Sequence, residues 1–318
     1  MAERIEYDEF GLFHENASEF GLPYDRPPTV RRESVEIEPG RRLSSLVWGV
    51  SEPELVLLHG GSQNAHTWDT VAMALGRPLV AIDLPGHGHS DGPGNRPEGQ
   101  LSAAGNAEDV AVVIRELASQ AQAVVGMSLG GITTIALTDV APDLVRRVVL
   151  VDVTPGVNPV KAKQITDFVN GPPSFSSFDE LLERTVQFNP TRTVSSLRRG
   201  ILHNAVQRED GTWVWRWARW REGMGGASAP ASPGQTREPQ RDTAPIFSNL
   251  WEVVSRIRVP VMLARGMLPQ SVVDDDDEAE LLKRLPGTKV VRFDKAGHSI
   301  QGDMPVELAQ EIDRFVFT

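Results

Sequence analysis

Ser128 is the residue of this chain whose surroundings best suit nucleophilic chemistry. It lies within Gly126-Met127-Ser128-Leu129-Gly130, between an apolar run at 121–125 and a helix-forming run at 131–140. A G-x-S-x-G sequence between a strand and a helix displays its serine on a sharp turn that small neighbours permit. A serine hydroxyl is a poor nucleophile at neutral pH unless a base lies within hydrogen-bond reach. The pattern therefore predicts Ser128 as a nucleophile and requires a base from elsewhere in the chain.

Three other segments place a motif directly after an apolar run. His59-Gly60-Gly61 follows residues 55–58, and Asp83-Leu84-Pro85-Gly86-His87-Gly88-His89-Ser90 follows residues 79–82. Ala296-Gly297-His298-Ser299 follows residues 289–293 near the C-terminus. With these motifs in this order around Ser128, the chain resembles the α/β-hydrolase family from about Val35 onward. The resemblance implies a mostly parallel sheet flanked by helices, and it leaves the substrate open because this fold hosts many activities.

The resemblance implies that His298 is the catalytic base, because the family places this histidine after its last strand. Family members most often carry the third triad residue, a carboxylate that orients the imidazole, after the strand predicted at 259–264. There this chain departs from the pattern, since it reads Arg265-Gly266-Met267-Leu268-Pro269-Gln270-Ser271 without an acid. Asp152, which ends the apolar run at 148–151, is the favoured replacement, as some family members use that position.

Two other sources of the acid stay open. Asp274 begins an acidic run that ends at Asp277. This run is also explained as a solvated helix N-terminus, where capping and the helix dipole favour aspartate. Asp303, or no acid at all, is the remaining alternative.

By the same resemblance, the backbone N–H groups of Gly61 and Leu129 form the oxyanion hole. His59 is expected to brace the loop that carries Gly61 without contacting the substrate. Met127 borders the site because it adjoins the nucleophile. The weaker pocket candidates are three tryptophans that core packing also explains: Trp68, Trp213 and Trp217.

The order of the predicted elements divides the chain into three parts. Residues 1–32 are polar with scattered aromatics and prolines, and they predict an irregular N-terminal extension. Residues 33–154 and 246–318 predict the hydrolase core, with a hairpin around Glu38-Pro39-Gly40-Arg41 followed by alternating strands and helices. Residues 155–245 interrupt this alternation, and the resemblance identifies them as a helical cap inserted after the sixth strand. Within the cap, the composition of residues 223–244 predicts a mobile loop.

Composition excludes several classes of protein. A formal net charge of −11 argues against nucleic acid and anionic membrane surfaces as partners. The chain has no cysteine, so it has no disulfide, thiolate nucleophile or zinc–cysteine site. No run approaches the ~18 apolar residues of a membrane span, and no signal peptide is recognised, so a cytoplasmic location is expected. Neither metal-ligand spacing nor a G-x-G-x-x-G motif is found, so no metal and no cofactor are expected.

Together these features predict a serine hydrolase that cleaves a small to medium ester, lactone or thioester through an acyl-enzyme on Ser128. Serine at the elbow excludes the haloalkane dehalogenase and epoxide hydrolase branches, which use aspartate there. Two alternatives stay open. The same triad can serve carbon–carbon bond hydrolysis, lyase or cofactor-free oxygenase chemistry, or the chain can be a ligand-binding protein with a vestigial site. The sequence does not decide between a monomer and a homodimer.

Overall fold

A mostly parallel eight-stranded sheet forms the centre of the molecule. The computed structural model describes residues 4–92, 102–157, 160–218 and 247–318. The strand order is β1-β2-β4-β3-β5-β6-β9-β10, in which β1, β2 and β4 pair antiparallel and the other neighbours pair parallel. The strands are β1 (Val30–Glu38), β2 (Arg41–Trp48), β3 (Leu55–Leu58), β4 (Leu79–Ile82), β5 (Ala123–Met127), β6 (Val148–Val151), β9 (Val261–Gly266) and β10 (Lys289–Phe293). The predicted hairpin and the mostly parallel sheet are confirmed.

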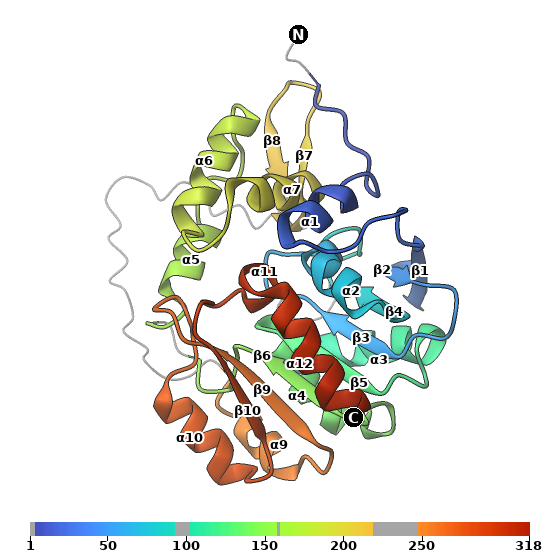
Figure 1. Cartoon of the computed structure of the whole chain (residues 1–318), viewed down its shortest axis with the longest axis vertical. Coiled ribbons are helices and arrows are strands. Elements are labelled where there is room, and N and C mark those ends of the chain that lie inside the picture. Colours follow the sequence, from blue (N-terminus) through green and yellow to red (C-terminus); the bar gives the residue numbers. More distant parts are fainter. Residues whose placement is uncertain (1–3, 93–101, 158–159, 219–246) are drawn as a thin grey trace.

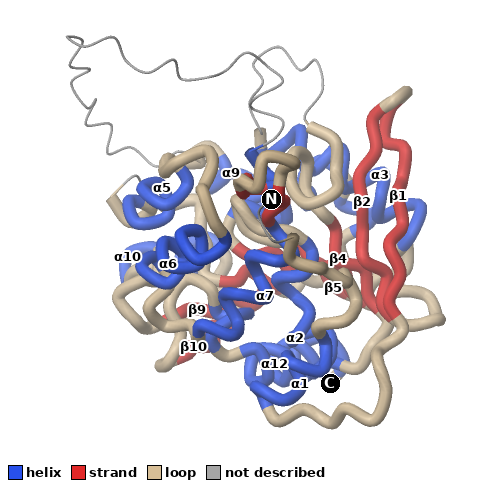
Figure 2. Tube along the Cα trace, turned by 90° about the horizontal axis from the view of Figure 1, so that it is seen from above, coloured by secondary structure: helices blue, strands red, loops and turns tan. Residues whose placement is uncertain are grey.

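Helices cover both faces of this sheet (Figures 1 and 2). One face packs against α3 (Ala103–Leu117), α4 (Leu129–Val140), α9 (Leu250–Arg256) and α10 (Asp275–Arg284). The other packs against α1 (Phe13–Phe20), α2 (Asp69–Leu75) and α12 (Pro305–Phe317). Val56 and Leu58 belong to the first core, whereas Leu55 and Leu57 belong to the second, as the alternation of side chains along a strand requires. Burial on both faces explains why the parallel strands are continuous apolar runs in the sequence.

The sequence predicts an irregular N-terminal extension, but the structure shows a helix within it. It contains α1, whose Phe13 and Ala17 are buried and lie one turn apart on the same helix face. Gly21 ends the helix with a φ of 64°, and its N–H bonds to the Ala17 carbonyl. The short apolar stripe of α1 is hidden in the sequence by the charged residues between its members. Phe13 packs edge-on against Trp48 with ring centroids 5.1 Å apart, so this helix is docked on the sheet.

Between β6 and α9 the chain leaves the sheet and forms a separate cluster of elements, which Figure 1 shows above the strands. They are α5 (Lys163–Val169), α6 (Phe178–Phe188), α7 (Val194–Asn204) and the hairpin of β7 (Ala205–Gln207) and β8 (Trp213–Trp215). The helices α6 and α7 lie within residues 155–245, for which the sequence predicts a helical insertion. Their apolar side chains form a third core of their own: Phe175, Leu181, Ile201, Ala205, Trp213, Trp215 and Trp217. The predicted mobile loop at 223–244 lies outside the described residues.

Within the described part of the chain, no helix combines the length and the apolar character that crossing a membrane requires.

Candidate active site

Ser128 lies on a strained turn between β5 and α4. Its φ of 51° and ψ of −117° are values that residues other than glycine rarely adopt. A Cβ atom at Gly126 would lie 2.4 Å from the Gly130 carbonyl oxygen, and one at Gly130 would lie 2.2 Å from the Leu58 carbonyl oxygen. The turn therefore closes only with glycine at both positions. It places Ser128 at the carboxyl end of β5 and at the N-terminus of α4.

Asp152 and His298 form a hydrogen-bonded pair beyond the ends of β6 and β10. The distance from His298 Nδ1 to an Asp152 carboxylate oxygen is 2.9 Å, and the Asp152 side chain is fully buried. Because Nδ1–H donates to the carboxylate, Nε2 is left as the proton acceptor of the ring. Ser128 and His298 line the same pocket. The structure thus brings the three predicted triad residues together at the carboxyl edge of the sheet.

The end of β9 and the loop that follows it also bind the Asp152 carboxylate. The backbone N–H groups of Gly266 and Val272 donate to it over 2.9 and 3.0 Å, and the Ser271 hydroxyl donates over 2.7 Å. This loop is the one that lacks the acid expected from the family pattern. It supplies hydrogen-bond donors instead, which orient a carboxylate from the neighbouring strand. Sequence reasoning missed Ser271, although a hydroxyl in this loop was the available signal.

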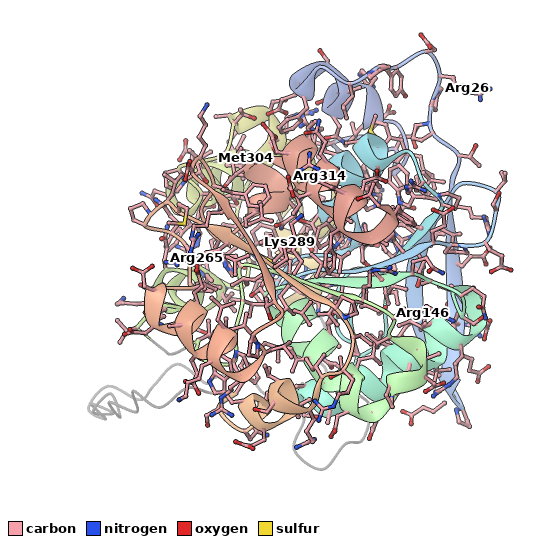
Figure 3. The ribbon with its side chains drawn as sticks, turned by 60° about the horizontal axis from the view of Figure 1, so that its bottom comes forward. Arg26, Arg146, Arg265, Lys289, Met304 and Arg314 are labelled. Atoms are coloured by element: carbon pink, nitrogen blue, oxygen red, sulfur yellow. The ribbon has the colours of Figure 1, made fainter. Side chains whose placement is uncertain are left out.

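Arg265, labelled in Figure 3, fixes the conformation of the same loop. Its Nε donates to the Val273 carbonyl over 3.2 Å, and its guanidinium pairs with the buried Glu278 of α10 at 2.7 Å. The segment that binds Asp152 is therefore tied to α10 on its far side.

The loop after β3 carries Gly61 past the nucleophile. A Cβ atom at Gly60 would lie 3.3 Å from Cβ of Ser128, so this backbone lies directly against the serine. A Cβ atom at Gly61 would meet nothing within 4 Å, because Gly61 borders open space. Leu129, on the other side of Ser128, borders the same space. The two predicted oxyanion donors thus flank Ser128.

His59 supports this loop from below. Its Nδ1 donates to the Gly60 carbonyl over 2.7 Å, and its Nε2 accepts from the backbone N–H of Leu84 over 2.9 Å. Burial lowers the pKa of His59, which keeps the ring neutral and able to accept that bond. The ring is fully buried beneath the loop, so its position agrees with the bracing role expected from the sequence.

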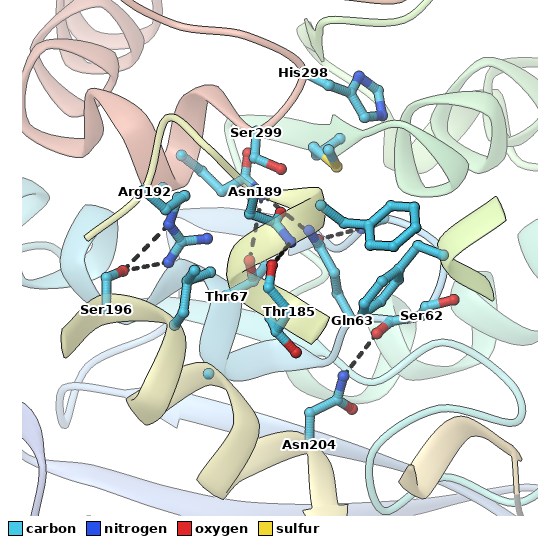
Figure 4. A pocket seen from close by; sticks show the side chains of 18 of the residues that line it. Ser62, Gln63, Thr67, Thr185, Asn189, Arg192, Ser196, Asn204, His298 and Ser299 are labelled. Carbon is cyan, nitrogen blue, oxygen red and sulfur yellow. Dashed lines mark hydrogen bonds between the residues drawn. The ribbon is translucent and has the colours of Figure 1, made fainter. Parts of the chain in front are cut away.

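Two cavities meet at Ser128, and both are lined by Gly61 and His298. The first has a volume of about 240 Å³ and extends between the core loops and the helices α5 to α7, with many polar side chains in its wall (Figure 4). The second has a volume of about 270 Å³ and a mostly apolar wall. Ser128 therefore borders one polar and one mostly apolar cavity.

The sequence model of the alpha/beta hydrolase family matches residues 55–311. This range contains the Ser128 turn, Asp152 and His298. The chain belongs to the alpha/beta hydrolase family.

This hydrolase is similar to the esterase Rv0045c of Mycobacterium tuberculosis, with 40% identity over 310 residues that make up 95% of this chain and 94% of the relative. The crystal structure of that esterase matches with a TM-score of 0.78 and covers 99% of this chain and 100% of that one, at 40% identity. The crystal structure of E-2-(acetamidomethylene)succinate hydrolase matches with a TM-score of 0.71 over 91% of this chain and 100% of that one, at 22% identity. The likeness to E-2-(acetamidomethylene)succinate hydrolase, at 22% identity, supports the fold alone.

Two of the predicted pocket tryptophans lie in hydrophobic cores of this hydrolase and not in the walls of the two cavities. Trp68 is completely shielded from solvent in the core between the sheet and α2. Trp213 packs edge-on against Phe178, with ring centroids 5.1 Å apart, inside the core of the inserted elements. Core packing, the competing explanation, therefore describes both rings, because each is buried among other large apolar side chains.

Other predicted pocket residues do reach the cavities. Met127 lines the first cavity and Trp217 lines the second. Trp215, which sequence reasoning did not single out, lines the first. Trp213 and Trp215 lie on one face of β8, and Trp217 follows the strand. All three rings belong to one hydrophobic cluster, so their spacing in the sequence does not reveal which of them borders a cavity.

The alternative acids have other partners in this hydrolase. Asp274 caps α10, where it accepts a hydrogen bond from the Asp277 N–H over 2.9 Å, and it pairs with Lys161 at 2.6 Å. Asp303 accepts from the Gly297 N–H over 2.9 Å and so supports the backbone beside His298. Neither carboxylate replaces Asp152 at the imidazole.

Among the described residues, His66, Asp69 and His203 are close enough to share a metal ion, with candidate ligand atoms within 4.8 Å of one another. Their present contacts form a different arrangement. The two nitrogens of His66 bond to Asp69 at 2.9 Å and to Glu9 at 3.1 Å, and the two imidazole rings stack at 3.8 Å with a 10° interplanar angle. A metal ion in the plane of both rings would require them to move apart. The group is a buried charge network that joins the N-terminal segment, the core and α7.

Proposed function

We propose that this chain hydrolyses a small to medium carboxylic ester, lactone or thioester through an acyl-enzyme on Ser128. The observation that carries the proposal is the 2.9 Å contact between His298 and Asp152 in the pocket that the strained Ser128 also lines. The similarity to a mycobacterial esterase over 95% of the chain supports the ester as substrate class.

In the proposed mechanism, Ser128 Oγ attacks the carbonyl carbon while His298 Nε2 accepts the hydroxyl proton. Asp152 stabilises the resulting imidazolium through its bond to Nδ1. The backbone N–H groups of Gly61 and Leu129 stabilise the negative charge that develops on the carbonyl oxygen. His298 then donates this proton to the leaving oxygen as its bond to the acyl carbon breaks, and the alcohol is released. Water, deprotonated by the same ring, attacks the acyl-enzyme and releases the acid.

We further propose that residues 155–245 act as the cap of this site. The helices α5 to α7 supply one wall of the first cavity, opposite the loops that carry Ser128 and His298. Cavities of about 240 and 270 Å³ favour a small-molecule substrate over a polymer. The hydrolytic steps written above require no cofactor.

The alternative of a vestigial site depended on the missing acid after β9. The contact between Asp152 and His298 weakens that alternative, because it supplies the orienting carboxylate from β6. Carbon–carbon bond hydrolysis, lyase chemistry and cofactor-free oxygenation use the same three residues, so a substrate panel separates them from ester hydrolysis.

The test uses an active-site-directed fluorophosphonate and a panel of p-nitrophenyl esters. Wild type is expected to be labelled on Ser128, as shown by peptide mass spectrometry, and to hydrolyse short esters. Ser128→Ala loses both properties, whereas Ser248→Ala, at an exposed serine on the chain, keeps both. An unlabelled wild type overturns the proposal. Labelling without turnover of any ester favours the other reactions on the same triad.

A further inference from the structure

The cations around the first cavity differ in how they are neutralised. Lys161 lies 2.6 Å from carboxylate oxygens of both Asp274 and Asp277. Arg199 is buried, forms an ion pair with Glu19 and donates to the Asn16 side chain over 2.7 Å. Both of these cations are therefore occupied by partners within the protein.

Arg192 has no carboxylate partner among the residues that the structure describes. Its guanidinium donates to the Ser196 hydroxyl, with Nε at 3.2 Å (Figure 4). Among the described residues, no carboxylate oxygen is close enough to the Arg192 guanidinium to form an ion pair with it. A guanidinium carries five N–H donors, so donors remain for a ligand. Arg192 is thus a charged group in the cavity wall that no carboxylate of the described residues pairs.

The position of this guanidinium is fixed by the backbone next to the catalytic histidine. Arg192 lies in the turn between α6 and α7, and a Cβ atom at Gly302 would lie only 2.5 Å from its Nη1. Gly302 belongs to α11 (Ile300–Asp303), the short helix that follows His298. Thr191 donates to Asp303 of the same helix over 2.9 Å. Arg192 therefore lies against α11, on the side of the cavity where His298 is found.

The guanidinium of Arg192 itself is the feature that favours an anionic ligand at this point. Burial lowers the pKa of Arg192, Asp303 and Glu19 raise it, and the Arg199 guanidinium lowers it further. The guanidinium stays charged at neutral pH. The chain as a whole has a formal charge of −11, which disfavours the approach of anions. The half-buried Arg192, which no described carboxylate pairs, supplies a local positive charge that an anionic group of the substrate can bind.

Resting on the proposed esterase function, we propose that Arg192 is a specificity-determining residue that binds a carboxylate on the substrate. The preferred substrate class is then an ester that carries a free carboxylate on the arm in the first cavity. The planar guanidinium matches the two oxygens of a carboxylate. The other arm is apolar, because Ile132, Val153 and Trp217 line the second cavity.

The test compares two esters with the same leaving group. Mono-p-nitrophenyl glutarate carries a carboxylate, whereas p-nitrophenyl valerate has an acyl chain of equal length without charge. The readout is the ratio of kcat/KM for the anionic ester to that for the neutral ester. Wild type is expected to favour the anionic ester, and Arg192→Met to lower the ratio at least ~10-fold, since hydrogen bonds to charged groups contribute that much.

A matched control removes the same charge outside the cavity. Arg198, on α7, is exposed and lies 3.5 Å from Glu15, and it does not line the first cavity. Arg198→Met is expected to leave the ratio of the two esters as in wild type. Arg192→Lys keeps the charge but loses the planar fork, so its ratio is expected between those of wild type and Arg192→Met. An equal fall in Arg198→Met and Arg192→Met overturns a specific role for Arg192.

A binding measurement keeps this proposal separate from the proposed function. Calorimetry follows the binding of glutarate to Ser128→Ala, in which Arg192 is intact, and to the double variant with Arg192→Gln. Binding that the double variant loses supports the carboxylate site even if no ester is turned over. Hydrolysis of the neutral ester without preference for the anionic one, together with no glutarate binding, overturns the Arg192 proposal and leaves the esterase proposal intact. Failure of the fluorophosphonate to label Ser128 overturns the esterase proposal alone.

Discussion

The Asn204 side chain donates a hydrogen bond of 2.6 Å to the Ser62 carbonyl. Asn204 is the last residue of α7, whereas Ser62 follows Gly61 in the core and has a φ of 63°. A reciprocal bond joins the two segments, since the Asn64 side chain donates to the His203 carbonyl over 2.9 Å. Two hydrogen bonds therefore connect the C-terminus of α7 to the loop beside Ser128.

Replacing Asn204 by alanine is expected to lower kcat/KM for a p-nitrophenyl ester about 10-fold. One hydrogen bond of about 1.4 kcal/mol corresponds to this factor, and its loss frees the loop that positions Gly61. The loss should appear mainly in kcat, because oxyanion stabilisation acts in the transition state. Steady-state kinetics and the rate of fluorophosphonate labelling measure it.

The control for this change is Asn249→Ala, at an exposed asparagine whose side chain caps nothing. It is expected to have wild-type kinetics. If Asn204→Ala were fully active while folded, the bond to Ser62 would have no part in positioning the loop.

The choice of Asp152 as triad acid is tested by Asp152→Asn. An amide at this position does not stabilise the His298 imidazolium and favours the wrong tautomer, so kcat is expected to fall by about 10³- to 10⁴-fold, as for the corresponding change in serine proteases. Asp274→Asn serves as the comparison, because asparagine also caps helices and α10 should remain intact. The opposite ranking of the two variants would move the acid to α10.

Because of the buried network around His66, the free energy of unfolding is expected to fall as the pH becomes alkaline. Burial favours the neutral ring, but the Asp69 carboxylate and the bonds to Asp69 and Glu9 outweigh it and raise the pKa of His66 to about 9. The ring titrates near 6.5 in the unfolded chain. Its contribution to the free energy of unfolding is therefore complete below about pH 6.5 and is lost as the pH rises through about 9.

Thermal unfolding of wild type and His66→Gln between pH 6 and pH 9.5 measures this contribution. The difference in Tm between the two proteins is expected to shrink as the pH rises across that interval. His14→Gln, at an exposed histidine, is expected to follow the wild-type pH profile. A Tm difference that is constant with pH would show that His66 is not charged in the folded protein.

The sequence predicted the sheet well because parallel strands buried on both faces are short, continuous apolar runs. It missed α1, where only two buried apolar residues, Phe13 and Ala17, mark the inner face of the helix beside the buried polar Asn16. Local composition there is dominated by charged and polar residues, which outnumber the few that pack. Whether such a segment folds depends on the surface that it meets, and that surface comes from distant parts of the chain.

Within the candidate site, the sequence points to residues that a local motif specifies and does not point to those brought in by tertiary contacts. Ser128 has a turn sequence that only glycine neighbours allow, so its position was visible in five residues. Ser271 and Arg192 lie in loops without a motif, and their significance depends on Asp152 and Gly302, which are far away in the chain. Trp68 and Trp213 were predicted as pocket residues but lie in hydrophobic cores. The size of an aromatic ring does not by itself distinguish a core residue from a residue of a pocket wall.

The glycines of the Ser128 turn are expected to be limiting for folding. Alanine at Gly130 would place Cβ 2.2 Å from the Leu58 carbonyl oxygen, where backbone and not a flexible side chain must move. Overpacking of this kind typically costs about 1–3 kcal/mol and occasionally more, so Gly130→Ala is expected to lower the free energy of unfolding by at least ~2 kcal/mol. Gly287→Ala is the matched variant, because a Cβ atom there meets nothing within 4 Å. Urea unfolding should therefore separate the two alanine variants clearly, and equal stability would mean that β3 and α4 yield without cost. Such an adjustment would also displace Ser128 from the loop that carries Gly61, so fluorophosphonate labelling of Gly130→Ala is expected to be slower than that of Gly287→Ala even in the folded fraction.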